Sequence, residues 1–205
     1  YRYEDILDRR DSMAQVIIQE LDALKKEYAK KRKTQIENAQ EAVYEEKKLE
    51  EMDIMFLMDK FGYCKTIDMT TYERNKEAAH AEFKYVIKCR NIGRICLFTN
   101  TGQLHTIKVV DIPFGKFRDK GLPVDNISNY SSSTENILII ASQSELNLYR
   151  LLFVTRQGMC KIVSGGEFDV TKRTVAATKL GEDDEVISIA LMTEHQHLIM
   201  QSKDG

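Results

Sequence analysis

The chain has 205 residues, of which 42% are apolar and 30% are charged, and 30 Lys and Arg against 32 Asp and Glu give a formal net charge of −2. This length and composition predict one or two folded domains and exclude an intrinsically disordered or collagen-like chain. No apolar stretch approaches the roughly 20 residues of a membrane span, so we expect a soluble protein with no membrane partner.

The cysteines and the first residues indicate the compartment. None of the four cysteines lies in a C-x-x-C pair, which favours a reducing compartment over secretion. The residues after Tyr1 lack the basic and apolar regions of a signal peptide. We therefore expect an intracellular protein, of which this chain is an excised piece.

Charge is unevenly distributed along the chain. Residues 1–52 hold 11 basic and 13 acidic side chains, and residues 53–205 hold 19 of each. Within the second part, residues 84–120 carry eight basic side chains against two acidic ones, and residues 150–173 carry five against two. A solvated face explains such a run as well as an anionic ligand does, so charge alone does not predict nucleic-acid binding.

The N-terminal part predicts helix. Ser12 and Gln15 have the spacing of a capping box, which predicts a helix start at Ser12. Residues 3–7 fit a preceding helix. Apolar residues then recur every three or four positions and form one stripe, made up of Met13, Ile17, Leu21, Leu24 and Tyr28. We expect a helical segment at 1–36, a connector at 37–52 and a β domain at 53–205.

From residue 53 onward, the apolar period changes to two and hairpins repeat. An apolar run, a short turn with a glycine and a second run predict hairpins over residues 54–67, 95–107 and 151–162, and residues 197–205 begin a fourth. Further strands are predicted over residues 136–141 and 185–192. The turn glycines are 40, 56 and 47 residues apart, a period typical of propeller-like blades, and are Gly62, Gly102, Gly158 and Gly205. The expected fold class is mainly β, a partial β-pinwheel of four-stranded antiparallel sheets preceded by an N-terminal helical segment.

Helix and repeats together resemble a known family. The helix runs into Tyr28-x-x-x-Arg32-x-Thr34-x-Ile36, and each hairpin that follows carries [Thr/Asp]-x-x-Gly after its apolar strand. In that order, these features resemble the A subunit of bacterial type IIA DNA topoisomerases, which are DNA gyrase and topoisomerase IV. Residues 1–36 are similar to the end of the coiled-coil arm, and residues 53–205 are similar to part of the C-terminal β-pinwheel.

The resemblance implies a function and partners. In this family, the C-terminal region binds and bends DNA without sequence specificity and supports the ATP-dependent change of DNA topology by the whole enzyme, an isomerase. The implied partners are double-stranded DNA, the B (ATPase) subunit of the whole enzyme, and the remainder of the A subunit, in the bacterial cytoplasm at the nucleoid. The family's catalytic tyrosine would lie upstream of Tyr1, so we expect this chain to carry no catalytic residues and no cofactor.

Basic residues on the connectors between hairpins are the candidates for DNA contacts, because phosphate binding needs cations but no base readout. Residues 114–123 offer three cations on a glycine-flanked loop, residues 170–174 offer two after the third hairpin, and two weaker candidates flank the third hairpin turn. The seven candidates are Lys116, Arg118, Lys120, Lys172, Arg173, Arg156 and Lys161.

No grouping of residues predicts catalysis or a metal site. His195 and His197 share one face of a predicted strand, but no carboxylate or cysteine at matching spacing completes a ligand set. Cys64, Cys96 and Cys160 lie within hairpins, where cysteine packs as a small apolar residue.

Two interpretations remain open. The first is a DNA-binding module of a topoisomerase, and the second is a propeller that binds proteins but not DNA, which the balanced charge of residues 53–205 favours. Within the first interpretation, gyrase A subunits carry a Gln-Arg-Arg-Gly-Gly-Arg-Gly box after the first blade, whereas residues 75–84 hold no glycine at the matching place. That difference favours a topoisomerase IV-like arm, or a divergent gyrase with weak supercoiling.

Overall fold

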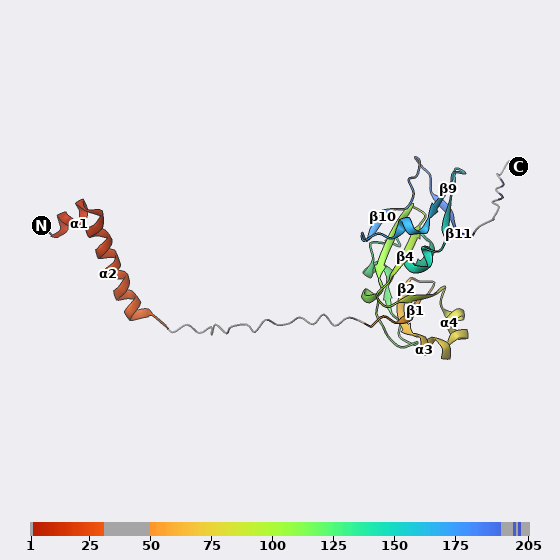
Figure 1. Ribbon diagram of the computed structural model, residues 1–205, viewed down its shortest axis with the longest axis horizontal. Coiled ribbons are helices and arrows are strands. Elements are labelled where there is room, and N and C mark those ends of the chain that lie inside the picture. Colours follow the sequence, from red (N-terminus) through yellow and green to blue (C-terminus); the bar gives the residue numbers. More distant parts are fainter. Residues whose placement is uncertain (1, 31–49, 194–198, 200, 202–205) are drawn as a thin grey trace. The chain divides into compact units, whose positions relative to one another are not determined.

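The computed structural model describes residues 2–30, 50–193, 199 and 201, which belong to two compact units at residues 1–47 and 48–205 (Figure 1). Three predicted features lie wholly or mostly outside the described residues. They are His195 and His197, nearly all of the fourth hairpin, and residues 31–49 of the arm and connector. No helix in the described part of the chain is long and apolar enough to cross a membrane.

The N-terminal unit consists of helices α1 (Arg2–Asp8) and α2 (Arg10–Tyr28). The predicted helix start at Ser12 is wrong, because α2 begins at Arg10. Arg9, between the two helices, has an extended backbone, and its carbonyl accepts the first helical hydrogen bond of α2, from Met13 N at 3.1 Å. The apolar stripe is present as predicted. None of its residues is buried, so the stripe is an exposed face of α2.

The larger unit is built from hairpins that each acquire a third strand. The three hairpins are β1 (Asp53–Met58) with β2 (Tyr63–Asp68), β4 (Arg94–Thr99) with β5 (Gln103–Lys108), and β8 (Arg150–Thr155) with β9 (Cys160–Ser164). A later strand pairs antiparallel with the first strand of each hairpin, and these are β3 (Tyr85–Arg90), β7 (Ile137–Ser142) and β11 (Val186–Met192). The mainly β fold and the three predicted hairpins are confirmed.

A fourth strand reaches each of the first two sheets from the connector after the next hairpin. Strand β6 (Leu122–Pro123) follows β5 but pairs with β2, which gives the order β3-β1-β2-β6. Strand β10 (Thr174–Ala176) follows β9 but pairs with β5, which gives β10-β5-β4-β7. The third sheet has the order β11-β8-β9 in the described residues. The sequence indicated only connectors here, because strands of two or three residues are too short to show a period.

Apolar side chains pack on both faces of the central hairpins. Along β4, Ile95 and Leu97 face a core shared with the first sheet, whereas Cys96 and Phe98 face a core shared with the third. Successive side chains of a strand point to opposite faces, so a strand buried on both sides reads as a continuous apolar run. In the second core, the Phe98 ring meets the Phe168 ring at 5.0 Å, edge to face.

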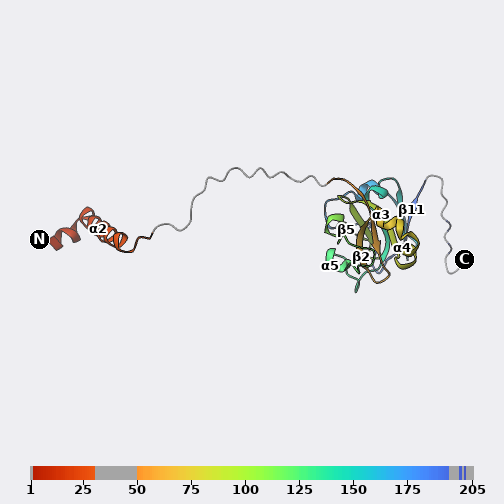
Figure 2. The same ribbon diagram turned by 90° about the horizontal axis from the view of Figure 1, so that it is seen from below.

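Two helices that the sequence analysis did not predict cover the outer face of the first sheet (Figure 2). The Asp68 carboxylate caps α3 (Met69–Arg74) by accepting from Thr71 N at 2.7 Å, and α4 (Lys76–Glu82) follows directly. Tyr72 of α3 and Ala79 of α4 pack on apolar side chains of β1 and β2. The remaining short helices are η1 (Val109–Asp111), α5 (Val124–Ile127), α6 (Gln143–Leu146) and η2 (Gly165–Phe168).

Candidate nucleic-acid interface

The candidate cations lie mainly on two connectors, which we define as the first connector (residues 109–121, between β5 and β6) and the second connector (residues 165–173, between β9 and β10). The first connector leads into β6, which pairs with β2, and the second leads into β10, which pairs with β5. Each connector thus ends as the fourth strand of the sheet that contains the preceding hairpin. The candidate residues therefore sit on segments held at the β6 and β10 edges of the sheets.

Backbone hydrogen bonds fix the first connector to β2. Thr66 N donates to Pro113 O at 2.9 Å, and Gly115 N donates to Thr66 O at 3.0 Å. Farther along, the Asp119 carboxylate accepts from Lys116 N at 2.7 Å, which closes a tight loop. The loop that carries the cations is thus shaped before any ligand arrives.

The three cations of this loop are exposed. Within the described residues, Lys116, Arg118 and Lys120 form no ion pair. The Lys120 ammonium lies 4.2 Å from the centre of the Tyr63 ring, a cation–π contact that leaves its charge uncompensated. Lys116 and Arg118 are therefore the most available of the three for an anionic ligand.

The second connector repeats this arrangement on β5. Thr106 N donates to Arg173 O at 2.8 Å, and Thr106 Oγ1 donates to Lys172 O at 2.9 Å. The side chains of Lys172 and Arg173 are exposed, and the guanidinium of Arg173 lies 3.9 Å from the Asp111 carboxylate of the first connector. The structure thus brings the start of the first connector beside the end of the second.

The two weaker candidates lie apart from the connectors, on the third hairpin. Arg156 forms an ion pair with Glu185, so its charge is offset locally, whereas Lys161 on β9 is exposed.

Sequence reasoning missed the residues that hold the connectors. Thr66 and Thr106 both lie four positions after a turn glycine, and both bind a connector carbonyl. Arg94 of β4 donates to Val170 O at 2.8 Å and so fixes the second connector from its other side. Alignment of the first two hairpins on their turn glycines would have shown the repeated threonine, a position that Ile162 occupies in the third hairpin.

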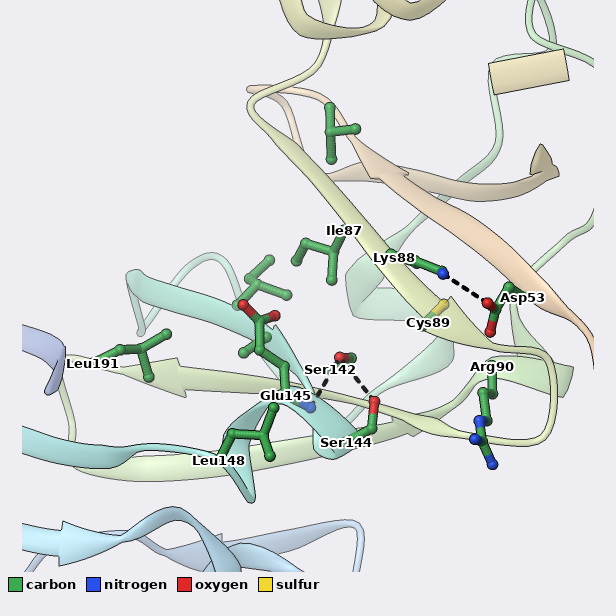
Figure 3. Close-up of a pocket in the computed structure, with 13 residues that line it drawn as sticks. Asp53, Ile87, Lys88, Cys89, Arg90, Ser142, Ser144, Glu145, Leu148 and Leu191 are labelled. Atoms are coloured by element: carbon green, nitrogen blue, oxygen red, sulfur yellow. Dashed lines mark hydrogen bonds and ion pairs between the residues drawn. The ribbon is translucent and has the colours of Figure 1, made fainter. Parts of the chain in front are cut away.

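A pocket of about 620 Å³ lies at the other edge of the sheets, between β3 and β7 (Figure 3). Its cations are already paired: Lys88 Nζ lies 2.7 Å from Asp53 Oδ2, and Arg90 Nη1 lies 3.1 Å from Glu51 Oε2. The hydrogen bond from Lys88 lowers the pKa of the Asp53 carboxyl. Because acids and bases pair with one another here, the pocket offers neither an activated nucleophile nor a net positive surface.

The two described histidines are held in structural contacts, and the cysteines differ in burial. His105 is buried, with Nε2 2.9 Å from Glu135 Oε2, and His80 Nε2 lies 3.1 Å from the Tyr72 hydroxyl. Cys64 and Cys96 are buried as predicted, whereas Cys160 on β9 is exposed, so that part of the prediction is wrong. Among the described residues, no group of three His, Cys, Asp or Glu side chains could hold a metal ion.

Comparisons with known proteins agree with this architecture. The family described as "DNA gyrase C-terminal domain, beta-propeller" matches residues 149–191, which hold β8, β9, β10 and all but the last residue of β11. The A subunit of DNA gyrase from Streptococcus pneumoniae (serotype 4) is 27% identical over 98% of this chain, and that from Lawsonia intracellularis is 27% identical over 99%. The chain spans about a quarter of the length of these relatives, 26% in both cases.

Solved structures show the same fold. The C-terminal domain of a DNA topoisomerase IV superposes with a TM-score of 0.60 at 22% identity, over 69% of this chain and 46% of that one. The E. coli ParC C-terminal domain superposes with a TM-score of 0.53 at 14% identity, over 69% of this chain and 57% of that one. The resemblance predicted from the sequence is confirmed: the chain is similar along nearly all its length to the A subunits of bacterial type IIA topoisomerases, and its β unit has the fold of their C-terminal β-pinwheel domains.

Proposed function

We propose that the β unit binds double-stranded DNA without reading its sequence and bends it, as the C-terminal region of a type IIA topoisomerase A subunit. The whole enzyme would use this region during the ATP-dependent change of DNA topology, together with the B subunit and the remainder of the A subunit, in the bacterial cytoplasm at the nucleoid. This chain would supply no catalytic residue and no cofactor.

One observation carries the proposal: exposed cations on both connectors stand on backbone that is already hydrogen-bonded to the preceding hairpin. A duplex carries one negative charge per about 1.7 Å of its axis, and each Lys or Arg that neutralises a phosphate releases a counterion. Because the connector backbone is already ordered, little conformational entropy is lost when DNA binds. Cations on two successive sheets would contact successive phosphates and favour a curved path.

The test is the salt dependence of DNA binding by the full chain, measured by fluorescence anisotropy with a labelled duplex. Changing Lys116, Arg118 and Lys120 together to Glu removes up to three phosphate contacts. Each contact contributes about 0.9 to the slope of log K against log salt, so the slope should fall by up to about 2.7. Circular dichroism should be unchanged, because the three side chains are exposed.

The matched control makes the same change of charge on α2 and beside it, at Lys25, Lys26 and Lys30, which are also exposed. The control should keep the wild-type slope. An equal loss in both variants would attribute the effect to net charge and remove the first connector from the site. Absence of binding by the wild-type chain at low salt would refute the proposal and favour a propeller that binds proteins.

A second measurement separates bending from wrapping. Nicked circles are relaxed, ligated in the presence of increasing protein and scored for a change in linking number. Since α4 (Lys76–Glu82) stands where gyrase A subunits carry the glycine-rich box, we expect bending with little change in linking number. A large positive change per bound protein would instead indicate gyrase-like wrapping.

A further inference from the structure

Lys65 is a buried cation at the centre of β2, with only 2% of its surface exposed. Its ammonium donates to Phe117 O and, at 2.5 Å, to Asp119 O, the two carbonyls on either side of Arg118. It also lies 4.9 Å from the centre of the Phe83 ring and 5.4 Å from that of Phe117. Lys65 is therefore enclosed between the sheet and the first connector.

The Lys65 ammonium is suited to this position because it donates hydrogen bonds to the connector. A buried ammonium is costly unless its protons are bonded, and here two of them meet backbone carbonyls. Burial lowers the pKa of Lys65, and the Asp119 carboxylate opposes that shift. An apolar side chain of the same length would fill the space but would leave both carbonyls without this donor.

The same repeat position contacts a connector in the second sheet. Lys65 and His105 both lie three residues after a turn glycine, and His105 is also only 2% exposed. His105 Nδ1 lies 3.1 Å from Thr174 Oγ1, directly after the second connector and next to Arg173. In two sheets, a buried polar side chain at one repeat position thus holds the chain beside the candidate cations.

We infer that Lys65 is a positioning residue for DNA binding, which fixes the loop that presents Lys116 and Arg118 to phosphates. It cannot contact DNA itself, because it is buried. This inference rests on the proposed function, since it names a residue that shapes the same site.

The first experiment uses Lys65→Met in the full chain, read by hydrogen exchange and DNA binding. Methionine is unbranched and one heavy atom shorter than lysine, so it fits the same space and removes the ammonium that donates to the two carbonyls. Loss of two charge-assisted hydrogen bonds should raise amide exchange of residues 115–121 roughly tenfold or more. The salt slope should fall by about 0.9 to 2.7, as if exposed phosphate contacts had been removed.

The matched control is Lys60→Met, the same substitution at an exposed lysine in the β1–β2 turn, which should leave both readouts at wild-type values. A double-mutant cycle then combines Lys65→Met with the three Glu substitutions on the first connector. If Lys65 acts through that connector, its effect on DNA affinity should disappear in the combined variant. An effect of undiminished size there would show general destabilisation and overturn the inference.

A second perturbation displaces the same loop and leaves the Lys65 ammonium in the protein. Gly121 has φ +79°, and a Cβ there would lie 2.3 Å from Cys64 O, so Gly121→Ala should displace the connector from β2. It should reproduce the faster exchange and the lower salt slope. Unchanged exchange of residues 115–121 in Lys65→Met would overturn the positioning role, whether or not the protein binds DNA. Faster exchange with an unchanged salt slope would show that Lys65 orders the loop but has no role in DNA binding, and would overturn the inference. If the wild-type chain does not bind DNA, the proposed function itself is refuted.

Discussion

Replacement of Gly165 by alanine should destabilise the β unit, because the site has no room for a Cβ. Gly165 begins η2 at the start of the second connector, and its amide donates to Tyr149 O at 2.9 Å. An added Cβ would lie 1.8 Å from Leu146 O and 2.9 Å from Tyr149 O. Both neighbours are backbone atoms, so relief requires movement of α6 or of the connector rather than rotation of a side chain.

The size of the effect follows from overpacking. Forced insertion of a methyl group into a packed site typically costs about 1–3 kcal/mol, and rigid backbone neighbours favour the upper part of that range. For a domain of this size, about 1 kcal/mol corresponds to roughly 2–4 °C in the midpoint of thermal unfolding. We therefore expect a loss of at least about 2 kcal/mol and a midpoint lower by about 4–8 °C.

The adjacent glycine supplies the control. A Cβ on Gly166 would find Ser164 Oγ as its nearest neighbour, at 3.9 Å, so Gly166→Ala should change stability by less than about 0.5 kcal/mol. The chain contains no tryptophan, so urea unfolding is best followed by far-UV circular dichroism. If the two variants unfold at the same urea concentration, the close approach of η2 to α6 is not a feature of the folded protein.

Two further predictions concern single side chains. Burial raises the pKa of the Cys64, Cys89 and Cys96 thiols to about 12. A thiol reagent should therefore label Cys160 alone in the native protein and all four cysteines in denaturant. Fast labelling of a second thiol in the native protein would contradict the packing of the hairpins. Asp68→Ala should cost about 1 kcal/mol through the lost cap of α3. Hydrogen bonds from Thr71 lower the pKa of Asp68, so its stabilisation should be present above the ordinary value of 3.8 and lost as the pH falls through the folded value; an equal difference between wild type and variant at neutral pH and near pH 2 would contradict this role.

Local pattern was sufficient for the hairpins and for the resemblance. The apolar runs and the turn glycines lie close together in the chain, and all three described turn glycines, Gly62, Gly102 and Gly158, adopt the positive φ that favours glycine. The charges of the connectors were also visible, because exposed cations need no partner to be recognised. For these features, the sequence alone identified both the elements and the candidate residues.

Contacts between distant residues decided the rest. Strands β6 and β10 form only because each connector meets a hairpin 58 to 73 residues earlier in the chain, such as Leu122 opposite Cys64. A lysine in an alternating strand reads as solvent-exposed, yet Lys65 is buried because the first connector closes over it. Arg156 read as available for phosphate, yet Glu185 offsets its charge. The sequence by itself determined the repeating hairpins. The tertiary structure decided which cations are exposed to solvent, because the exposure of a side chain depends on which distant segment covers its strand.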